Sequence, residues 1–303
     1  MSAEASWIEA MRLGDFRAAH AISDAMLAAR DLNARDDPSL PYHRRWVWDG
    51  QDFEGRDVLV RCYHGLGDTI QFARFLPELR RRAASVSVEV QPELFGLFST
   101  IPGIDRLIPF RPSAPTPPAE RTVEIMELAH ALRLDALGDA VPYFAIRPAK
   151  LDRRSGLNIG LCWQSGGWDD ARSVPCERLR KAVAIPGVHC WCLQYRQEHA
   201  EDPPALRGAV PAGADVLTTA AAIAALDAIV TVDTMVAHLA GALGRESCLL
   251  LRRDCDWRWM TDGHHSPWYP TTRLYRQDVD GDWSAPLARL RDDLRLRIAA
   301  AGC

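Results

Sequence analysis

Apolar residues recur along this chain in two spacings that alternate from about residue 57 onward. Short β-branched or apolar runs predict strands, and the apolar positions three and four residues apart between them predict helices. In the first half we expect strands at 58–62, 86–90, 106–109 and 124–128, and helices at 69–82, 92–100 and 132–137. The second half repeats the pattern, with strands at 158–163, 189–193, 228–232 and 248–251 and helices at 176–183, 218–226, 236–243 and 286–301. This alternation predicts two α/β domains, each a parallel sheet covered by helices.

The segments outside this pattern set the expected domain organisation. Residues 1–32 carry two apolar stripes separated by Gly14-Asp15, which predicts a helical hairpin resembling one tetratricopeptide-type unit. A single unit cannot bury its own faces, so we expect it to pack on the main body, with docking of a protein partner as the alternative. The polar stretch 33–56 is read as a connection with room for a short edge strand at Trp46–Trp48. The predicted parts are a hairpin (1–35), two Rossmann-like domains (36–148 and 149–285) and a closing helix (286–303).

Composition and charge exclude several classes of protein. The 303 residues are 48% hydrophobic and 25% charged, with a net charge of -4, which is typical of a globular chain and favours no nucleic acid partner. Eight cysteines are scattered without a CxxC pair, so neither a zinc site nor a disulfide framework is expected. The N-terminus lacks a secretion-signal pattern, and no apolar run is long enough to cross a membrane. We therefore expect a cytoplasmic protein with at most peripheral membrane contact.

One stretch, residues 58–79, reads as strand, tight turn and helix around Gly65-Leu66-Gly67-Asp68. Glycines in such a turn allow unusual backbone conformations and close approach of another molecule. A helix that begins there directs unpaired N–H groups toward whatever binds at the turn. Asp68 is open to two interpretations, a helix N-cap or a functional carboxylate.

A second stretch, residues 228–244, repeats this arrangement. A hydrophobic strand ends at Asp233-Thr234, and a helix of small residues follows in which His238 lies one turn after Thr234. Ligands of open parallel sheets bind beyond the carboxyl ends of the strands, so Thr234, the first helical amides and His238 are candidates to hold a phosphate. The alternative is that Asp233 or Thr234 caps the helix and His238 is a packing residue.

Together, GLGDTIQFARFLPEL, IVTVDTMVAHLAGALG and the tail CDWRWMTDGHHSPWYPTTRLYRQ at 255–277 resemble the family 9 glycosyltransferases, heptosyltransferase-like enzymes with a branch fused to tetratricopeptide repeats. The resemblance spans about residues 40–285. It implies the GT-B architecture, in which two Rossmann-like domains face a cleft, the first taking the acceptor and the second the nucleotide sugar.

Site residues follow from the same resemblance. It implies that Asp68 is the general base and that Arg172 is the basic residue of the loop after the first strand of the second domain. It assigns donor binding to Gln194, Asp233, Thr234 and His238, next to which Met235 lies. Gly65 and Gly67 join the candidate donor site because glycines permit close approach, and Trp268 joins it because an aromatic ring can stack on a sugar or base. Two departures concern specificity: Met235 stands where lipopolysaccharide heptosyltransferases carry glycine, and MELAHAL (126–132) replaces a small polar residue and proline on the acceptor side.

These residues suit transfer of a glycosyl group from a nucleotide-diphosphate sugar, because donors and cations would stabilise the departing diphosphate while a carboxylate takes the acceptor proton. Direct attack inverts the anomeric centre. Asp169-Asp170 and Asp292-Asp293 are not at strand ends, so we expect no metal and no cofactor besides the donor sugar. The expected acceptor is a glycan, a lipid-linked saccharide or a protein. The alternatives are a catalytically silent GT-B-like module that binds partners and, more weakly, a sugar-nucleotide epimerase-type enzyme.

Overall fold

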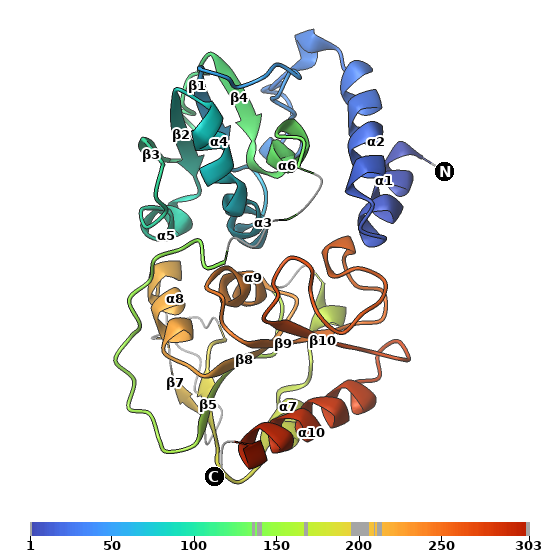
Figure 1. Ribbon diagram of the computed structural model, residues 1–303, viewed down its shortest axis with the longest axis vertical. Coiled ribbons are helices and arrows are strands. Elements are labelled where there is room, and N and C mark those ends of the chain that lie inside the picture. Colours follow the sequence, from blue (N-terminus) through green and yellow to red (C-terminus); the bar gives the residue numbers. More distant parts are fainter. Residues whose placement is uncertain are drawn as a thin grey trace. The chain divides into compact units, whose positions relative to one another are not determined.

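The computed structural model describes residues 2–134, 137, 141–166, 169–194, 206–208, 210 and 214–300. The chain divides into two compact units, Met1–Ala145 and Ile146–Cys303, each built on its own sheet (Figure 1). The boundary expected from the sequence, between residues 148 and 149, lies close to this division. In the described part of the chain, no helix is both long and apolar enough to cross a membrane.

The described part of unit 1 contains a sheet of four parallel strands in the order β3-β2-β1-β4. They are β1 (Asp57–Arg61), β2 (Ser85–Val90), β3 (Arg106–Pro109) and β4 (Arg121–Glu124), and the helices that follow them are α3 (Leu66–Phe72), α4 (Leu76–Arg82), α5 (Phe95–Phe98) and α6 (Leu128–Ala131). The chain proceeds outward from β1 to β3 and then returns to the other side of β1 as β4. This reversal creates a switch point between the carboxyl ends of β1 and β4.

A helical hairpin, α1 (Ala3–Arg12) and α2 (Phe16–Ala28), precedes the sheet. Asp24 of α2 pairs with His130 at 2.8 Å and with Arg133 at 2.7 Å, and Arg30 pairs with Glu127 at 3.1 Å. The predicted hairpin is therefore present, and polar contacts attach it to the rest of unit 1 around α6.

Among its described residues, unit 2 has a sheet of six parallel strands in the order β10-β9-β8-β5-β6-β7. They are β5 (Leu157–Cys162), β6 (Val188–Cys192), β7 (Arg207–Gly208), β8 (Ala228–Val232), β9 (Ser247–Leu251) and β10 (Thr272–Arg276), with helices α7 (Cys176–Val183), α8 (Val216–Ala224), α9 (Met235–Ala242) and α10 (Ser284–Ala300). Strands β6 and β7 lie to one side of β5, and β8 to β10 lie to the other. The carboxyl ends of β5 and β8 therefore form the switch point of unit 2.

Helices cover both faces of this second sheet, as Figure 1 shows. Ile159, Leu161 and Val230 alternate toward the face shared by α7 and α10, where Leu179 and Leu290 complete a buried core. On the opposite face, Gly160 of β5 leaves room for Leu193 and Leu226, since a Cβ there would approach a methyl group of Leu193 to 2.4 Å. This arrangement explains why the central strands read as continuous apolar runs.

Most predicted elements occur within a few residues of their expected positions, but several differ. The helix expected over 69–82 begins at Leu66 and is divided by the 3₁₀ turn Ala73–Phe75, because Pro77 has no N–H to continue the helical hydrogen bonds. The strand expected at 124–128 is wrong: β4 ends at Glu124, whose side chain accepts the Met126 N–H and turns the chain into a 3₁₀ segment. Of the helix expected at 132–137, residues 132–134 are not helical, residues 135 and 136 lie outside the described part, and α6 instead occupies 128–131.

The structure also differs from the prediction at Trp46–Trp48, at two short strands and at the closing helix. Trp46–Trp48 forms no strand, and the Trp48 indole instead donates to the carbonyl of Gln51. Strands β7 and β10 were not predicted. The closing helix, expected from residue 286, begins at Ser284. The last residues of the predicted closing segment, 301–303, lie outside the described part.

Candidate functional site

The switch point of unit 2 brings the loops after β5 and β8 together. Cys162 Sγ at the end of β5 lies 3.9 Å from Thr234 Oγ1, just beyond β8. Thr234 is the N-cap of α9, and its hydroxyl accepts the N–H of Val236 at 3.2 Å. The cap interpretation of Thr234 is therefore correct, and it places the start of α9 at the position where an open α/β sheet binds ligands.

Arg172 occupies this switch point next to Asp233. Its Nη1 donates to the main-chain oxygen of Asp233 at 3.1 Å and lies 3.7 Å from the Asp233 carboxylate. Burial raises the pKa of Asp233, and the nearby Asp256 adds to the increase, whereas Arg172, Trp259 and Arg258 act in the opposite direction. The structure thus brings Arg172 next to Asp233, which is 61 residues further along the chain and directly precedes Thr234.

A second arginine, Arg252, joins this group and was not among the predicted residues. Asp169 Oδ2 lies 3.7 Å from Arg172 Nε and 3.3 Å from Arg252 Nη1, so one carboxylate pairs with both guanidinium groups. Arg252 is the first residue after β9. The signal for it was present in the sequence, because a basic residue directly after a buried parallel strand lies at the ligand-binding edge.

His238 is buried one turn into α9. Its Nδ1 lies 3.1 Å from the Tyr269 hydroxyl, and its ring stacks on Trp259 with centroids 5.2 Å apart. Tyr269 in turn packs against Gly241, where a Cβ would come within 2.2 Å of the phenol ring. A set of aromatic rings therefore fixes the orientation of the imidazole.

This arrangement changes the interpretation of Trp268. Both Trp268 and Tyr269 are 0% exposed. Trp268 packs edge-on against Trp257, so its ring presents no surface on which a sugar or base can stack. The burial of Trp268 therefore argues against the expectation that this residue contacts the donor. The aromatic segment instead forms the support behind His238.

Gln194 and Met235 flank the same switch point. Gln194 Oε1 accepts the N–H groups of Trp163 at 3.1 Å and Gln164 at 2.9 Å, while its Nε2 donates to the carbonyl of Gln164 at 3.1 Å. Its amide is thus committed to shaping the loop after β5. Met235 is the first residue of α9 and is half-buried.

The glycine-rich turn lies at the switch point of unit 1. Asp68 Oδ2 accepts the N–H of Gly65 at 3.1 Å, which fixes the half-buried carboxylate at the start of α3. Gly65 has a φ of -66°, so the turn does not require a left-handed backbone at this residue. A Cβ at Gly65 would lie 3.1 Å from Asp68 Oδ2, and Gly67 is inside the first turn of α3. Gly65, and not Asp68, is therefore the N-cap of α3, while Asp68 stands at the third helical position and its carboxylate accepts the N–H of the N-cap residue. The N-cap interpretation of Asp68 is wrong, and its catalytic interpretation stays a prediction.

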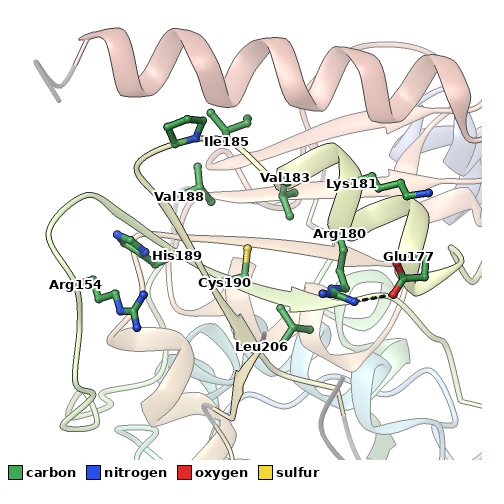
Figure 2. A pocket seen from close by; sticks show the side chains of 12 residues that line it. Arg154, Glu177, Arg180, Lys181, Val183, Ile185, Val188, His189, Cys190 and Leu206 are labelled. Carbon is green, nitrogen blue, oxygen red and sulfur yellow. Dashed lines mark hydrogen bonds and ion pairs between the residues drawn. The ribbon is translucent and has the colours of Figure 1, made fainter. Parts of the chain in front are cut away.

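A cavity of about 720 Å³ lies elsewhere in unit 2, beside α7 and the loop that precedes β6 (Figure 2). Its apolar lining includes Val183, Val188 and Leu206, and basic side chains such as Arg180 stand around it. It is built around the amino end of β6, and none of the predicted site residues lines it. This cavity is therefore separate from the switch point of the sheet.

Comparisons with known proteins relate the chain to others of similar sequence and fold. No protein-family model matches the chain. Among curated proteins, FlbA of Caulobacter vibrioides is 26% identical over 291 residues, covering 82% of this chain and 48% of that protein. The chain thus spans about half the length of the curated relative it matches.

Solved structures resemble the chain over most of its length. A family 9 glycosyltransferase from Veillonella parvula superposes with a TM-score of 0.56 at 11% identity, covering 83% of this chain and 98% of that one. ADP-heptose lipopolysaccharide heptosyltransferase II of E. coli superposes with a TM-score of 0.57 at 14% identity, covering 82% of this chain and 100% of that one. The dodecameric iron-containing glycosyltransferase TibC of E. coli H10407 superposes with a TM-score of 0.60 at 10% identity, covering 84% of this chain and 78% of that one. With its two parallel, helix-covered sheets, the chain has the GT-B fold found in the family 9 glycosyltransferases.

Proposed function

We propose that the protein is an inverting, metal-independent glycosyltransferase that moves a sugar from a nucleotide-diphosphate donor to a hydroxyl acceptor. The observation that carries this proposal is the group of cations at the switch point of unit 2. Arg172 and Arg252 are held by Asp169 beside the Thr234-capped start of α9. A diphosphate is the ligand chemistry that such a site suits, because guanidinium groups and helix N-terminal amides both favour phosphate oxygens.

The same group would assist departure of the nucleoside diphosphate. As the bond between the sugar and the diphosphate breaks, negative charge grows on the phosphate oxygens, and preorganised donors lower the energy of that state. Asp169 lies between the two guanidinium groups, so it holds them in place before a ligand arrives. In this proposal Arg172 and Arg252 replace a metal ion as the electrophilic partner of the leaving group.

Asp68 is the proposed general base. Its Oδ2 accepts the Gly65 N–H, which restricts the carboxylate to one orientation. Removal of the acceptor proton by a carboxylate in hydrogen-bond reach is a common source of rate enhancement. The acceptor hydroxyl attacks the anomeric carbon, its proton goes to Asp68, and the diphosphate leaves with the bonding electrons.

The donor and the acceptor are proposed only as chemical classes. One of the similar structures is named as an enzyme of ADP-heptose, so an adenosine diphosphate sugar is the first donor to test. Met235 at the first position of α9 gives this chain a bulkier entrance to the helix than a glycine would. The acceptor is a glycan, a lipid-linked saccharide or a protein.

The test is donor-dependent transfer by the variant Asp68→Asn. Asparagine can still accept the Gly65 N–H but cannot take a proton at neutral pH, so we expect transfer to fall by about 10²–10⁴-fold while donor binding is retained. Asp15→Asn is the matched control, because the Asp15 carboxylate likewise accepts a backbone N–H at the start of a helix, α2. Full transfer by Asp68→Asn would remove Asp68 from the base role.

A catalytically silent module that binds a protein partner is the second candidate. It is favoured by apolar side chains on and next to the N-terminal hairpin, where Leu13 is 68% exposed and Leu32 is 64% exposed. The two candidates differ in the behaviour of unit 2. A silent module would bind a partner through the hairpin and would show neither nucleoside diphosphate binding nor transfer.

A further inference from the structure

We propose that Gln91 is a positioning residue for Asp68, because its side-chain amide clamps both ends of the turn that carries this carboxylate. The inference rests on the proposed function, in which Asp68 is the base of the reaction. It adds a residue from a neighbouring strand that the glycine-rich motif does not contain.

The sheet of unit 1 brings Gln91 to this turn. Strands β1 and β2 are parallel neighbours, and Cys62, which follows β1, donates to the carbonyl of Glu89 in β2 at 3.1 Å. The chain that leaves β1 therefore stays beside the chain that leaves β2. Gln91 is the first residue after β2 and precedes Pro92. A residue before proline is restricted to extended conformations, in agreement with the φ of -53° and the ψ of 139° at Gln91.

A single amide nitrogen makes both contacts of the clamp. Gln91 Nε2 donates to the main-chain oxygen of His64 at 2.7 Å and to the hydroxyl of Thr69 at 2.9 Å. A carbonyl oxygen only accepts hydrogen bonds, so the nitrogen end of the amide is the end that faces His64. His64 directly precedes Gly65, and Thr69 directly follows Asp68. The side chain of Gln91 therefore spans the whole turn from its first residue to its last.

The hydrogen bonds within the turn connect this clamp to the carboxylate. Thr69 is 0% exposed, and its N–H donates to the carbonyl of Gly65 at 3.0 Å. The N–H of Gly65 in turn donates to Asp68 Oδ2 at 3.1 Å. Displacement of His64 or Thr69 would therefore move Gly65, which is the donor that orients the carboxylate of Asp68.

The amide of Gln91 uses only its donor end. Among the described residues, Gln91 Oε1 is buried and has no hydrogen-bond partner. An unpaired buried acceptor destabilises a fold, so stability alone does not account for a glutamine at this position. Holding the turn of the base in place does account for it.

The first test measures amide hydrogen exchange by NMR in the wild type and in Gln91→Met, which keeps a long side chain but donates neither hydrogen bond. Exchange of the amide at position 69 requires the turn to open, so it should become about 2–10-fold faster, the factor expected for loss of such hydrogen bonds. Unchanged exchange at position 69 would overturn the clamp. This measurement needs no turnover, so it separates failure of the clamp from failure of the proposed function.

Two references accompany this measurement. The N–H of Ala237 donates to the carbonyl of Thr234 at 3.0 Å at the start of α9, and its exchange in unit 2 should not change. Gln51→Met is the matched control, because Gln51 is an exposed glutamine of unit 1. It should leave the exchange of both amides as in the wild type.

The second test separates kcat from the KM of the donor. A base displaced by about 1 Å can cost up to about 10²-fold in rate, so Gln91→Met should lower kcat by about 10–100-fold. The KM of the donor should stay unchanged, because the proposed diphosphate site is in unit 2. Wild-type kcat together with faster exchange at position 69 would overturn the positioning role, and so would a loss confined to KM.

Variants of Thr69 serve in both tests if Gln91→Met does not fold. Thr69→Val keeps the shape of the side chain but removes the hydroxyl that accepts from Gln91, so it should show faster exchange and lower kcat. Thr69→Ser keeps the hydroxyl and should lose much less of kcat than Thr69→Val. Equal losses in the two variants would assign the effect to packing instead of the hydrogen bond, and would overturn the inference.

Discussion

Arg172 is tied to Asp233 by a hydrogen bond from its Nη1 to the main-chain oxygen, 3.1 Å long. The bond joins the loop after β5 to the end of β8, the two strands that flank the switch point of unit 2. A guanidinium held this way loses less conformational freedom when a ligand binds than a side chain moving in solvent. The Arg172 guanidinium is therefore in position before the donor arrives.

Replacing Arg172 with alanine should weaken binding of a nucleoside diphosphate by about 10–100-fold, the cost of losing a hydrogen bond to a charged group. Isothermal titration calorimetry measures the effect directly. Arg253→Ala is the matched control, because Arg253 is an exposed arginine of the same unit. Equal affinities in the wild type and Arg172→Ala would remove Arg172 from the donor site.

Arg252→Ala should also weaken binding, by about 3–10-fold at low salt, and the loss should shrink as salt increases because Arg252 is about a third exposed. The pair Arg172 and Arg252 shares Asp169, so the double variant should lose less than the sum of the two single losses in free energy. A fully additive result would argue that Asp169 does not couple the two guanidinium groups.

The contact between Gly241 and Tyr269 predicts a stability effect away from the ligand. A Cβ at position 241 would overlap the Tyr269 ring, so Gly241→Ala should destabilise the fold by about 1–3 kcal/mol. Gly166→Ala is the control, because a Cβ there meets no atom within 4 Å. Chemical unfolding measures both variants, and equal stability of the two would contradict the packing described for α9.

The raised pKa of Asp233 predicts that the free energy of unfolding depends on pH. Because its pKa is raised in the folded protein, the folded state binds more protons than the unfolded state as pH increases from the usual aspartate range. This group therefore costs stability progressively until the pH has passed its folded pKa. Asparagine does not titrate, so the free energy of unfolding of Asp233→Asn relative to wild type should rise over the same range. Urea unfolding at several pH values measures this difference, and a constant difference would contradict the raised pKa.

Sequence periodicity predicted the architecture well because each sheet is built from buried, regularly spaced apolar runs. Strand Ala228–Val232 and helix Cys176–Val183 occur where they were expected. The failures have local causes, such as the Glu124 side chain that ends β4. Strand β10 was missed because Thr272–Arg276 is short and includes two arginines, so it shows neither a continuous apolar run nor a regular alternation.

The candidate site was predicted less completely. Thr234, Asp233 and Arg172 could be named from two strand–turn–helix patterns and a family resemblance. Arg252 carried a sequence signal, since it directly follows a buried strand, but its pairing with Asp169 depends on which strands are neighbours in the sheet. Trp268 was assigned to the donor because aromatic residues stack on sugars, but burial in tertiary packing decides which tryptophans are accessible.

The central claim is that unit 2 binds the diphosphate of a nucleotide sugar. The most direct measurement is a calorimetric titration of the wild-type protein with ADP, UDP, GDP and dTDP, repeated with Arg172→Ala and Asp68→Asn. The account predicts saturable binding of one of these nucleotides, lost in Arg172→Ala and kept in Asp68→Asn. Absence of binding for all four, or binding that is indifferent to Arg172, would contradict it.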